Sequence, residues 1–467
     1  MASSDVDPES IPLHLAIVGG GIAGCAAASW ASSHGARVSL INAGMPLGGA
    51  CIHAESFPAR LLMNAATDHY RAGRPRFPGI RTSTASPNWS ELTAHRRSMA
   101  DEISRDTHRM LTEQKKVELI VGYASFVDQQ TLRVGEELIR PDRILLTPGS
   151  PSEMPDIDGL DDIDVLDLPR LLDSDRLPKR LLFFGTTPSS VAYAQMMTRL
   201  GSNVTILADT SFLSGEDYSR KITSALSEIL IEDGIEIIED STITHTEKRD
   251  GYIRAFGTCK DHPCHWDADS LVLANHHRPR TSELHPHRAG IELNDQGLIV
   301  IDETLQTTNP MVFAAGDAIG GGVHAYAAAY DAVLAAKNAI SRSRTAGATT
   351  AIPFAIYTDP QVAGVGWDEQ QAAQAGFHTE TTTINLSQIP ASRALGYHRG
   401  FVQLCRDSRS DHLLGARILA PNASELIMEA ALAIRSGLTV SELATLIHPP
   451  ISMGDAIARA AALFHSS

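Results

Sequence analysis

The chain has 467 residues, a formal net charge of −16 and 5 cysteines. This length suffices for about three domains, and an acidic balance without any Lys or Arg cluster argues against nucleic acid and anionic lipid as partners. So few cysteines do not make the disulfide framework of a secreted protein, and Asp5, Asp7 and Glu9 stand where a secretory signal carries positive charge. We therefore expect a cytoplasmic protein that binds neither nucleic acid nor a membrane.

The first predicted unit is a strand, a glycine-rich turn, a helix and a second strand. The apolar run at 13–18 precedes Gly19, Gly21 and Gly24, and the Ala-rich stretch that follows leads to a strand ending at Asn42. In this context the G-x-G-x-x-G spacing predicts a dinucleotide site, because glycines let the backbone approach a pyrophosphate at a helix N-terminus. Asn42 stands where an acid usually binds the ribose hydroxyls, and its amide can hydrogen-bond them without a charge.

A second unit of the same kind is predicted at 180–209. A strand leads to Gly185, a helix follows, and the next strand ends at Asp209. This unit predicts a second dinucleotide site, for which NAD(P)H is the candidate ligand. The later glycines of the motif are missing, and His276 and His277 stand where a glycine is expected, so these positions argue for a changed cofactor path.

The last part of the chain has a different character. From residue 346 onward, strand-like runs such as AIPFAIYT and LLGARIL precede a helical stretch at 424–437, which predicts a separate α+β domain. Upstream of it, Cys259, His262 and Cys264 match no standard zinc spacing, so we expect no metal site.

Three segments resemble the class I pyridine nucleotide-disulfide oxidoreductases, especially the mercuric reductase and dihydrolipoamide dehydrogenase branches. They are the first glycine motif, the segment GGACIHAESFPAR and the segment AAGDA. The resemblance implies an α/β fold with two Rossmann-like dinucleotide-binding domains and a C-terminal α+β dimerisation domain. The implied FAD domain, residues 1–155 and 285–345, is split around an NAD(P)-type domain at 156–284, and the dimerisation domain covers 346–467.

FAD and a homodimer are also implied, because in this family the C-terminal His-Pro completes the flavin site of the partner. Asp317 matches the family acid that binds the ribityl chain of FAD. The implied cofactor-binding residues are Gly19, Gly21, Gly24, Asn42, Gly49, Gly149, Gly316 and Asp317.

The redox segment departs from the family pattern. Cys51 matches the first redox cysteine, but the second is Ser56, and a hydroxyl cannot complete a dithiol couple. Arg60 matches the lysine beside the flavin, and Ala192 stands in place of its glutamate partner, so the usual ion pair is lost. Cys51, Ser56 and Arg60 are nevertheless candidate catalytic residues.

The fourth candidate catalytic residue is His448, which matches the general base of the family. The glutamate that orients this base is replaced by Met453. The leading hypothesis is an FAD-dependent oxidoreductase without a dithiol relay, in which hydride passes from NAD(P)H to the flavin and electrons then pass to a small-molecule acceptor. One alternative is a flavoenzyme that acts directly on a pathway-specific substrate and has a vestigial nicotinamide domain. The other is a non-catalytic scaffold that binds FAD.

Overall fold

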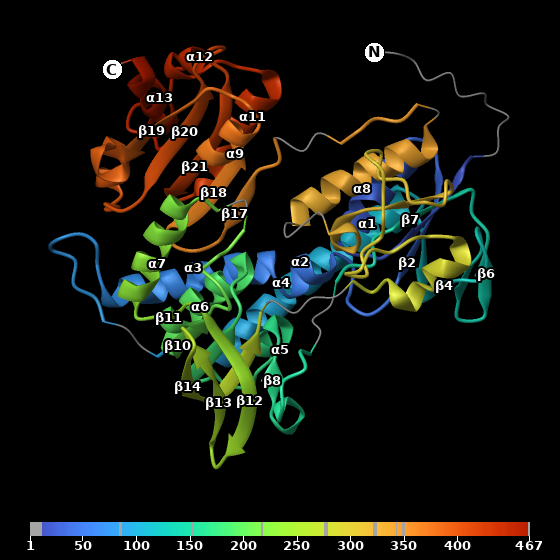
Figure 1. Ribbon diagram of the computed structural model, residues 1–467, viewed down its shortest axis with the longest axis horizontal. Coiled ribbons are helices and arrows are strands. Elements are labelled where there is room, and N and C mark those ends of the chain that lie inside the picture. Colours follow the sequence, from blue (N-terminus) through green and yellow to red (C-terminus); the bar gives the residue numbers. More distant parts are fainter. Residues whose placement is uncertain are drawn as a thin grey trace. The chain divides into compact units, whose positions relative to one another are not determined.

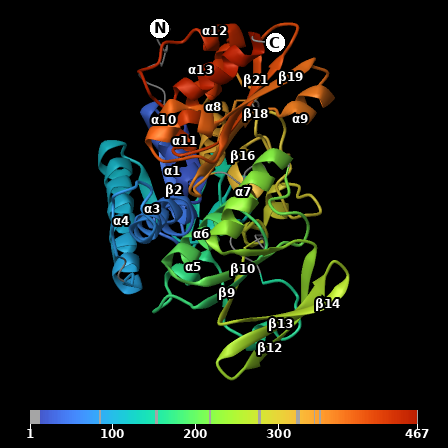
Figure 2. The same cartoon turned by 90° about the vertical axis from the view of Figure 1, so that its left-hand side faces the viewer.

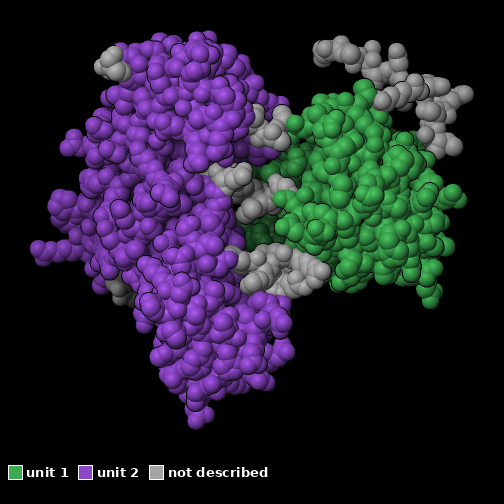
Figure 3. All heavy atoms as spheres, viewed as in Figure 1, with its two compact units in different colours: residues 1–57, 95–153, 277–347 green, residues 58–94, 154–276, 348–467 purple. Residues whose placement is uncertain are grey.

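The computed structural model describes most of the chain (Figure 1), which forms two compact units (Figure 3). Unit 1 consists of residues 1–57, 95–153 and 277–347, and unit 2 of residues 58–94, 154–276 and 348–467. The described residues are 12–83, 86–150, 154–215, 218–274, 279–320, 325–341, 343–347 and 351–465. Each unit is assembled from three separated segments, so neither is a continuous stretch of sequence.

Unit 1 is built on a five-stranded parallel sheet with the order β16-β7-β1-β2-β3. Residues Leu15 to Val18 of β1 are all buried, as expected for a parallel sheet covered on both faces. Helices α1 and α8 lie side by side (Figure 1), because both present small alanine side chains to each other. These elements are β1 (His14–Val18), α1 (Ile22–Ser33), β2 (Arg37–Asn42), β3 (Glu118–Val121), β7 (Arg143–Leu146), β16 (Val312–Ala314) and α8 (Ala325–Ile340).

Two further groups of elements complete the N-terminal part. A small antiparallel sheet with the order β4-β5-β6 belongs to unit 1. The helices after β2 are α2, α3 and α4, and the division between the units passes through α3 and α4. The bounds are β4 (Ala124–Phe126), β5 (Leu132–Val134), β6 (Glu137–Ile139), α2 (Gly49–His53), α3 (Ser56–Gly73) and α4 (Trp89–Arg109).

Unit 2 contains a second five-stranded parallel sheet, with the order β11-β10-β9-β15-β8. Phe183 of β9 and Tyr193 of α6 are fully buried in its core. A three-stranded antiparallel sheet, β12-β13-β14, extends from it (Figure 2). The bounds are β8 (Val165–Leu166), β9 (Arg180–Phe184), α6 (Pro188–Leu200), β10 (Asn203–Leu207), α7 (Arg220–Asp233), β11 (Glu236–Ile238), β12 (Ser241–Arg249), β13 (Tyr252–Cys259), β14 (His262–Ala268) and β15 (Ser270–Leu273).

The C-terminal part of unit 2 is an antiparallel sheet, β17-β18-β21-β20-β19, with helices packed against it. All eight residues of β21 are buried, so this strand is the centre of the sheet. The bounds are β17 (Phe354–Ile356), β18 (Gln361–Gly366), α9 (Glu369–Gln374), β19 (Thr379–Asn385), β20 (Phe401–Asp407), β21 (Leu413–Ala420), α11 (Ala423–Ser436), α12 (Val440–Ala444) and α13 (Asp455–Ala462).

The observed architecture confirms the predicted fold class of two dinucleotide-type α/β units and a C-terminal α+β part. Residues 348–467 belong to the same compact unit as residues 154–276. In the part of the chain that the structure describes, no helix is both long and apolar enough to cross a lipid bilayer.

Candidate functional site

The first glycine motif forms the close-packed turn that its spacing predicts. Gly19 has φ +114°, and a Cβ atom at this position would lie 1.9 Å from the carbonyl oxygen of Thr147. A Cβ atom at Gly24 would lie 1.8 Å from the carbonyl oxygen of Gly19. Only glycine fits at these two positions, because any side chain would overlap backbone that cannot move independently.

Gly21 differs from its two neighbours in the motif because space is open around it. A Cβ atom built at Gly21 meets nothing within 4 Å, and its φ of −68° suits any residue. Gly21 is the N-cap of α1 and lines a cavity of about 510 Å³ in unit 1. The space beside the glycine and the N–H groups at the start of α1 fit a pyrophosphate. This cavity is where the residues would hold FAD.

The structure brings all but one of the predicted cofactor-binding residues to this cavity. Gly19, Gly21, Asn42, Gly49, Gly149, Gly316 and Asp317 line it, together with Cys51. Gly24 packs behind the turn against Gly19. The side-chain amide of Asn42 holds the turn itself, because its Oδ1 accepts from the Gly20 N–H at 3.1 Å and its Nδ2 donates to the Met45 carbonyl at 3.1 Å. Its predicted contact with a ribose stays a prediction.

Arg280 is a cavity residue that the sequence reasoning missed. Its backbone N–H donates to the Gly149 carbonyl at 3.3 Å, and its guanidinium lies 5.9 Å from the centre of the Tyr123 ring. The side chain therefore brings a positive charge to a cavity suited to a diphosphate. No local signal marked it, because Arg280 belongs to a polar crossing far from the glycine motif in sequence.

Cys51 lies in α2 at the edge of this cavity, and Ser56 begins α3. Burial raises the pKa of the Cys51 thiol above its ordinary value of 9.0, and a hydrogen bond with Ser56 only partly opposes this shift. The sulfur is therefore a protonated thiol at neutral pH, unlike reactive cysteines whose pKa is lowered by neighbouring cations. A hydroxyl stands beside it where the resemblance implies a second thiol.

His53, two residues after Cys51, is held in one tautomer. Ser104 Oγ donates to the Leu47 carbonyl at 2.6 Å, so it accepts from His53 Nε2–H at 2.8 Å. Burial is the main cause that lowers the pKa of His53. The ring is thus neutral at pH 7 and serves to tie α2 to α4.

Arg60 has a carboxylate partner, although the usual one at position 192 is replaced by alanine as the sequence shows. Its Nη2 lies 2.8 Å from Glu425 Oε1 on α11, and its guanidinium lies 5.3 Å from the centre of the Tyr357 ring. The hydrogen bond with Glu425 is the main cause that raises the pKa of Arg60. The family pattern points only to position 192, and Glu425 lies 365 residues from Arg60, so the sequence alone does not indicate this partner.

His448 also has a carboxylate partner. Its Nε2 lies 3.1 Å from Oε2 of Glu429, which is another residue of α11. Met453 stands where the family pattern has the orienting glutamate, and Glu429 brings a carboxylate to the histidine from another helix. Arg60, His448 and their two partners all belong to unit 2, whereas Cys51 and Ser56 belong to unit 1.

In the second nucleotide-type unit, side chains at the N-terminus of α6 accept hydrogen bonds from the backbone N–H groups there. Thr187 Oγ1 accepts from Ser190 N–H at 3.1 Å, and Ser190 Oγ accepts from Thr187 N–H at 2.8 Å. This capping box uses two N–H groups that a bound diphosphate otherwise contacts at the N-terminus of α6. His276 and His277, which were predicted to alter the cofactor path, lie outside the described residues.

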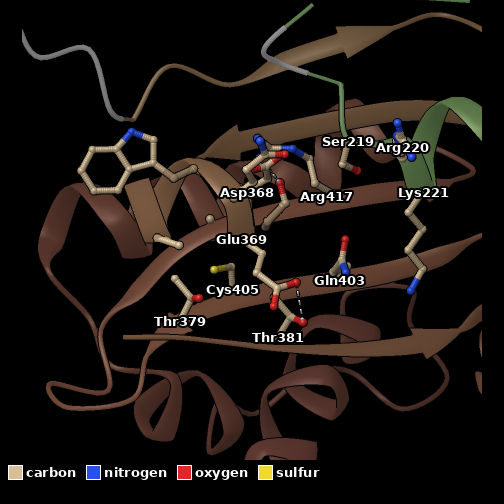
Figure 4. A pocket seen from close by; sticks show the side chains of 15 residues that line it. Ser219, Arg220, Lys221, Asp368, Glu369, Thr379, Thr381, Gln403, Cys405 and Arg417 are labelled. Carbon is tan, nitrogen blue, oxygen red and sulfur yellow. Dashed lines mark hydrogen bonds between the residues drawn. The ribbon is translucent and has the colours of Figure 1, made fainter. Parts of the chain in front are cut away.

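None of the other four cysteines, all within the described residues, forms a disulfide with Cys51. Burial raises the pKa of Cys25 to about 11, and its Sγ donates to the Gly20 carbonyl at 3.3 Å. Burial likewise raises the pKa of Cys405 to about 12, where it lines a separate cavity of about 460 Å³ in unit 2 (Figure 4). Figure 4 shows Glu369 and Lys221 pointing into the same space. All five cysteines, each within the described ranges, are free thiols.

The Cys259–Cys264 hairpin joins β13 and β14. Across the ranges that the structure describes, no group of three or more His, Cys, Asp or Glu side chains is arranged to hold a metal ion.

These features define a class of protein, an α/β protein with two dinucleotide-binding-type units and a C-terminal α+β part. Residues 13–334 match the pyridine nucleotide-disulphide oxidoreductase family, and residues 352–461 match the dimerisation domain of that family. The chain therefore belongs to the pyridine nucleotide-disulphide oxidoreductases, as predicted.

Several individual proteins are similar over nearly the whole chain. A mercuric reductase from Acidithiobacillus ferrooxidans is 33% identical over 473 residues, which cover 99% of this chain and 84% of that protein. A mercuric reductase from Shigella flexneri is 33% identical over 479 residues, covering 100% and 83%. Among solved structures, the HOCl-induced flavoprotein disulfide reductase RclA from Escherichia coli has a TM-score of 0.85 at 25% identity, covering 96% of this chain and 99% of RclA.

Family membership supports both predicted cofactors. The family is FAD-dependent and takes its electrons from NAD(P)H, in agreement with the prediction of FAD and of NAD(P)H as the candidate second ligand. The chain is thus a flavoprotein oxidoreductase, and the roles of its individual catalytic residues remain predictions.

Proposed function

We propose that this protein is an FAD-dependent oxidoreductase that works without a dithiol relay and reduces a small-molecule acceptor with electrons from NAD(P)H. The overall reaction is NAD(P)H plus H⁺ plus acceptor, giving NAD(P)⁺ and the acceptor with two added hydrogens. The observation that carries the proposal is the pairing of Cys51 with the hydroxyl of Ser56 instead of a second thiol. A single buried thiol cannot take up and release two electrons as a disulfide does.

Each candidate site residue named below has a defined task in this proposal. FAD, when bound, accepts hydride from NAD(P)H and passes two electrons to the acceptor. The turn of Gly19 and Gly21 and the start of α1 bind the diphosphate. The protonated thiol of Cys51 and the hydroxyl of Ser56 line the acceptor side and offer hydrogen-bond donors. His448 gives a proton to the reduced acceptor and regains it from water.

Mercuric ion is not the acceptor in this proposal, although several relatives are named mercuric reductases. Mercuric ion binds to thiolates, and burial raises the pKa of both Cys51 and Cys405 above the ordinary value, so these thiols are protonated at neutral pH. An organic two-electron acceptor such as a quinone needs protons as well as electrons, which suits the proton-donating groups proposed here.

A second candidate function is direct oxidation of a substrate by the flavin, without nicotinamide. The capping box of Thr187 and Ser190 favours it, because it occupies N–H groups that otherwise bind the diphosphate of a nicotinamide cofactor.

An anaerobic titration of the purified protein with NADH and then NADPH tests the proposed function. We expect the visible flavin band to bleach fully with about one equivalent of NAD(P)H per FAD, because only the flavin stores electrons. A protein with a working dithiol takes up about two equivalents, since the disulfide adds a second two-electron store. The Cys51→Ser variant serves as the matched control and should bleach with the same stoichiometry. Uptake of two equivalents would contradict the dithiol-free proposal, and no bleaching would favour direct oxidation.

The functional molecule in this proposal is a homodimer formed through the C-terminal part. Large apolar side chains are exposed on α11 and in the loop around His448 in the single chain: Met428 54%, Leu432 62%, Ile447 98% and Ile451 67%. Residues 352–461 match a dimerisation domain, so a second copy of the chain is the partner that covers this surface. His448, which follows Ile447, then faces the flavin site of the partner.

Substitution Leu432→Glu is expected to weaken this dimer at least about tenfold, because burying a charge in place of an apolar side chain costs more than 1.4 kcal/mol. Light scattering at low micromolar concentration should then give a mass near that of the 50.1 kDa chain. Leu138→Glu is the matched control, since Leu138 is 58% exposed but lies on β6 in unit 1. A variant Leu432→Glu that stays as dimeric as the control would contradict the proposed interface.

A further inference from the structure

Helix α11 carries two glutamates that face the two candidate catalytic residues of unit 2. Glu425 and Glu429 are four residues apart, so they lie one above the other on one face of the helix. Glu425 pairs with Arg60 at 2.8 Å, and Glu429 pairs with His448 at 3.1 Å. The resemblance had located the partners of these residues at Ala192 and Met453, where neither carries a carboxylate. One helix therefore supplies both missing carboxylates.

The two pairs differ in their exposure to water. The side chains of Arg60 and Glu425 are 43% and 63% exposed, so their attraction is weakened by solvent. The side chains of His448 and Glu429 are 13% and 26% exposed. The more buried pair restrains its partners more strongly, because the alternative to the hydrogen bond is a poorly solvated carboxylate.

The surroundings of His448 hold its ring in this orientation. Gly454 packs on the ring, since a Cβ atom there would lie 3.0 Å from His448 Cδ2. With Nε2–H donating to Glu429, the other ring nitrogen, Nδ1, has a contact of 3.3 Å with the Leu446 carbonyl. A carbonyl oxygen only accepts, so Nδ1 donates this bond when it carries a proton, and the bond is longer than a good hydrogen bond. Nδ1 is therefore the nitrogen that can exchange a proton with an acceptor, as in catalytic histidines whose second nitrogen is held by a carboxylate.

We propose that Glu429 is the positioning residue of His448, and that it replaces from α11 the glutamate that the family carries five residues after the histidine. This inference rests on the proposed function, because it gives His448 the task of protonating the reduced acceptor. Glu429 touches neither the cofactor nor the acceptor in this role. It fixes the tautomer in which Nε2 carries a hydrogen and Nδ1 exchanges one.

Two acceptors separate proton delivery from electron transfer in the holoenzyme. A water-soluble benzoquinone takes up two electrons and two protons, whereas ferricyanide takes up one electron and no proton. We expect Glu429→Gln to lower kcat with benzoquinone about tenfold, and His448→Ala to lower it about 100-fold, the usual range for a lost general acid. The KM for NAD(P)H and turnover with ferricyanide should stay unchanged, which a general structural defect would not allow.

Glu228→Gln is the matched control, because Glu228 is an exposed glutamate of α7 in the same unit and has no part in the proposed site, so kcat with both acceptors should stay unchanged. A double-mutant cycle completes the test. In the His448→Ala background, Glu429→Gln should have less than about a twofold further effect, because it acts only through the histidine. Full activity of Glu429→Gln alongside a defective His448→Ala would overturn the inference and leave the proposed function standing. Equal losses with both acceptors, or effects that add in the double variant, would also overturn it. Full activity of His448→Ala would remove the histidine from the proposed function and the inference with it.

Discussion

The variant Gly21→Val is expected to fold normally and to lose FAD. Its backbone φ of −68° suits valine, and a Cβ atom at this position has no protein atom within 4 Å, because it points into the open space beside the start of α1. The side chain then occupies the place of the diphosphate. Loss of even one charge-assisted hydrogen bond costs about 1.5–3 kcal/mol, so FAD should bind roughly 10–100-fold more weakly. The ratio of flavin to protein absorbance after gel filtration measures this loss directly.

A control at another glycine separates cofactor loss from misfolding. Gly347 is exposed, has no positive φ, and a Cβ atom there would lie 3.5 Å from a Leu334 methyl group, an ordinary contact. Gly347→Val should therefore keep its FAD. Gly24→Val should fail differently, by yielding little folded protein, because its Cβ atom would lie 1.8 Å from the Gly19 carbonyl oxygen. A Gly21→Val protein that retains stoichiometric FAD would show that the diphosphate binds elsewhere.

The sequence predicted those parts of the site that depend on neighbours in the chain. Gly19, Gly21 and Gly24 lie in one turn between β1 and α1, so their spacing alone fixes their geometry. Arg60 and Glu425 are 365 positions apart, and no periodicity links a helix near the N-terminus to one in the C-terminal part. In the sequence, Glu429 likewise resembles any other charged residue of an amphipathic helix. Only in the folded chain does it lie next to His448. Arg280 was missed for the same reason.

The family pattern was informative about positions and misleading about partners. It marked Cys51, Arg60 and His448 as candidates, and their catalytic roles stay predictions. However, a carboxylate can reach a given site from any helix, strand or loop that lies close enough for its side chain to extend to that site. The loss of a glutamate at Met453 therefore does not imply that the histidine lacks one.

Arg199→Met is expected to destabilise unit 2 strongly. Arg199 lies 2.9 Å from Asp233 and 2.8 Å from Asp359, and the side chains of Arg199 and Asp233 are only 5% and 7% exposed. Removing the cation leaves buried carboxylates without their main partner, which typically costs about 3–5 kcal/mol. For a unit of this size we expect the thermal midpoint of the holoenzyme to fall by roughly 5–10 °C. Arg399→Met is the matched control, because its partner Glu232 adjoins Asp233 on α7 but this pair is 53% and 56% exposed.

The pH dependence of this defect follows from the charges around Asp359. Burial raises the pKa of this carboxyl group, but the charges of Arg199 and Arg71 outweigh burial and hold the pKa below its ordinary value. In the native protein the stabilisation by this carboxylate is therefore fully present at pH values above the ordinary pKa of an aspartate. It is lost only as the pH falls through the lowered pKa of Asp359. Without Arg199, less positive charge opposes the effect of burial, and the pKa of Asp359 rises. Protonation of Asp359 then removes the unpaired buried charge. The difference in thermal midpoint between Arg199→Met and the unaltered protein should consequently shrink as pH is lowered from neutral toward 5, whereas a defect caused by lost packing alone would be the same at both.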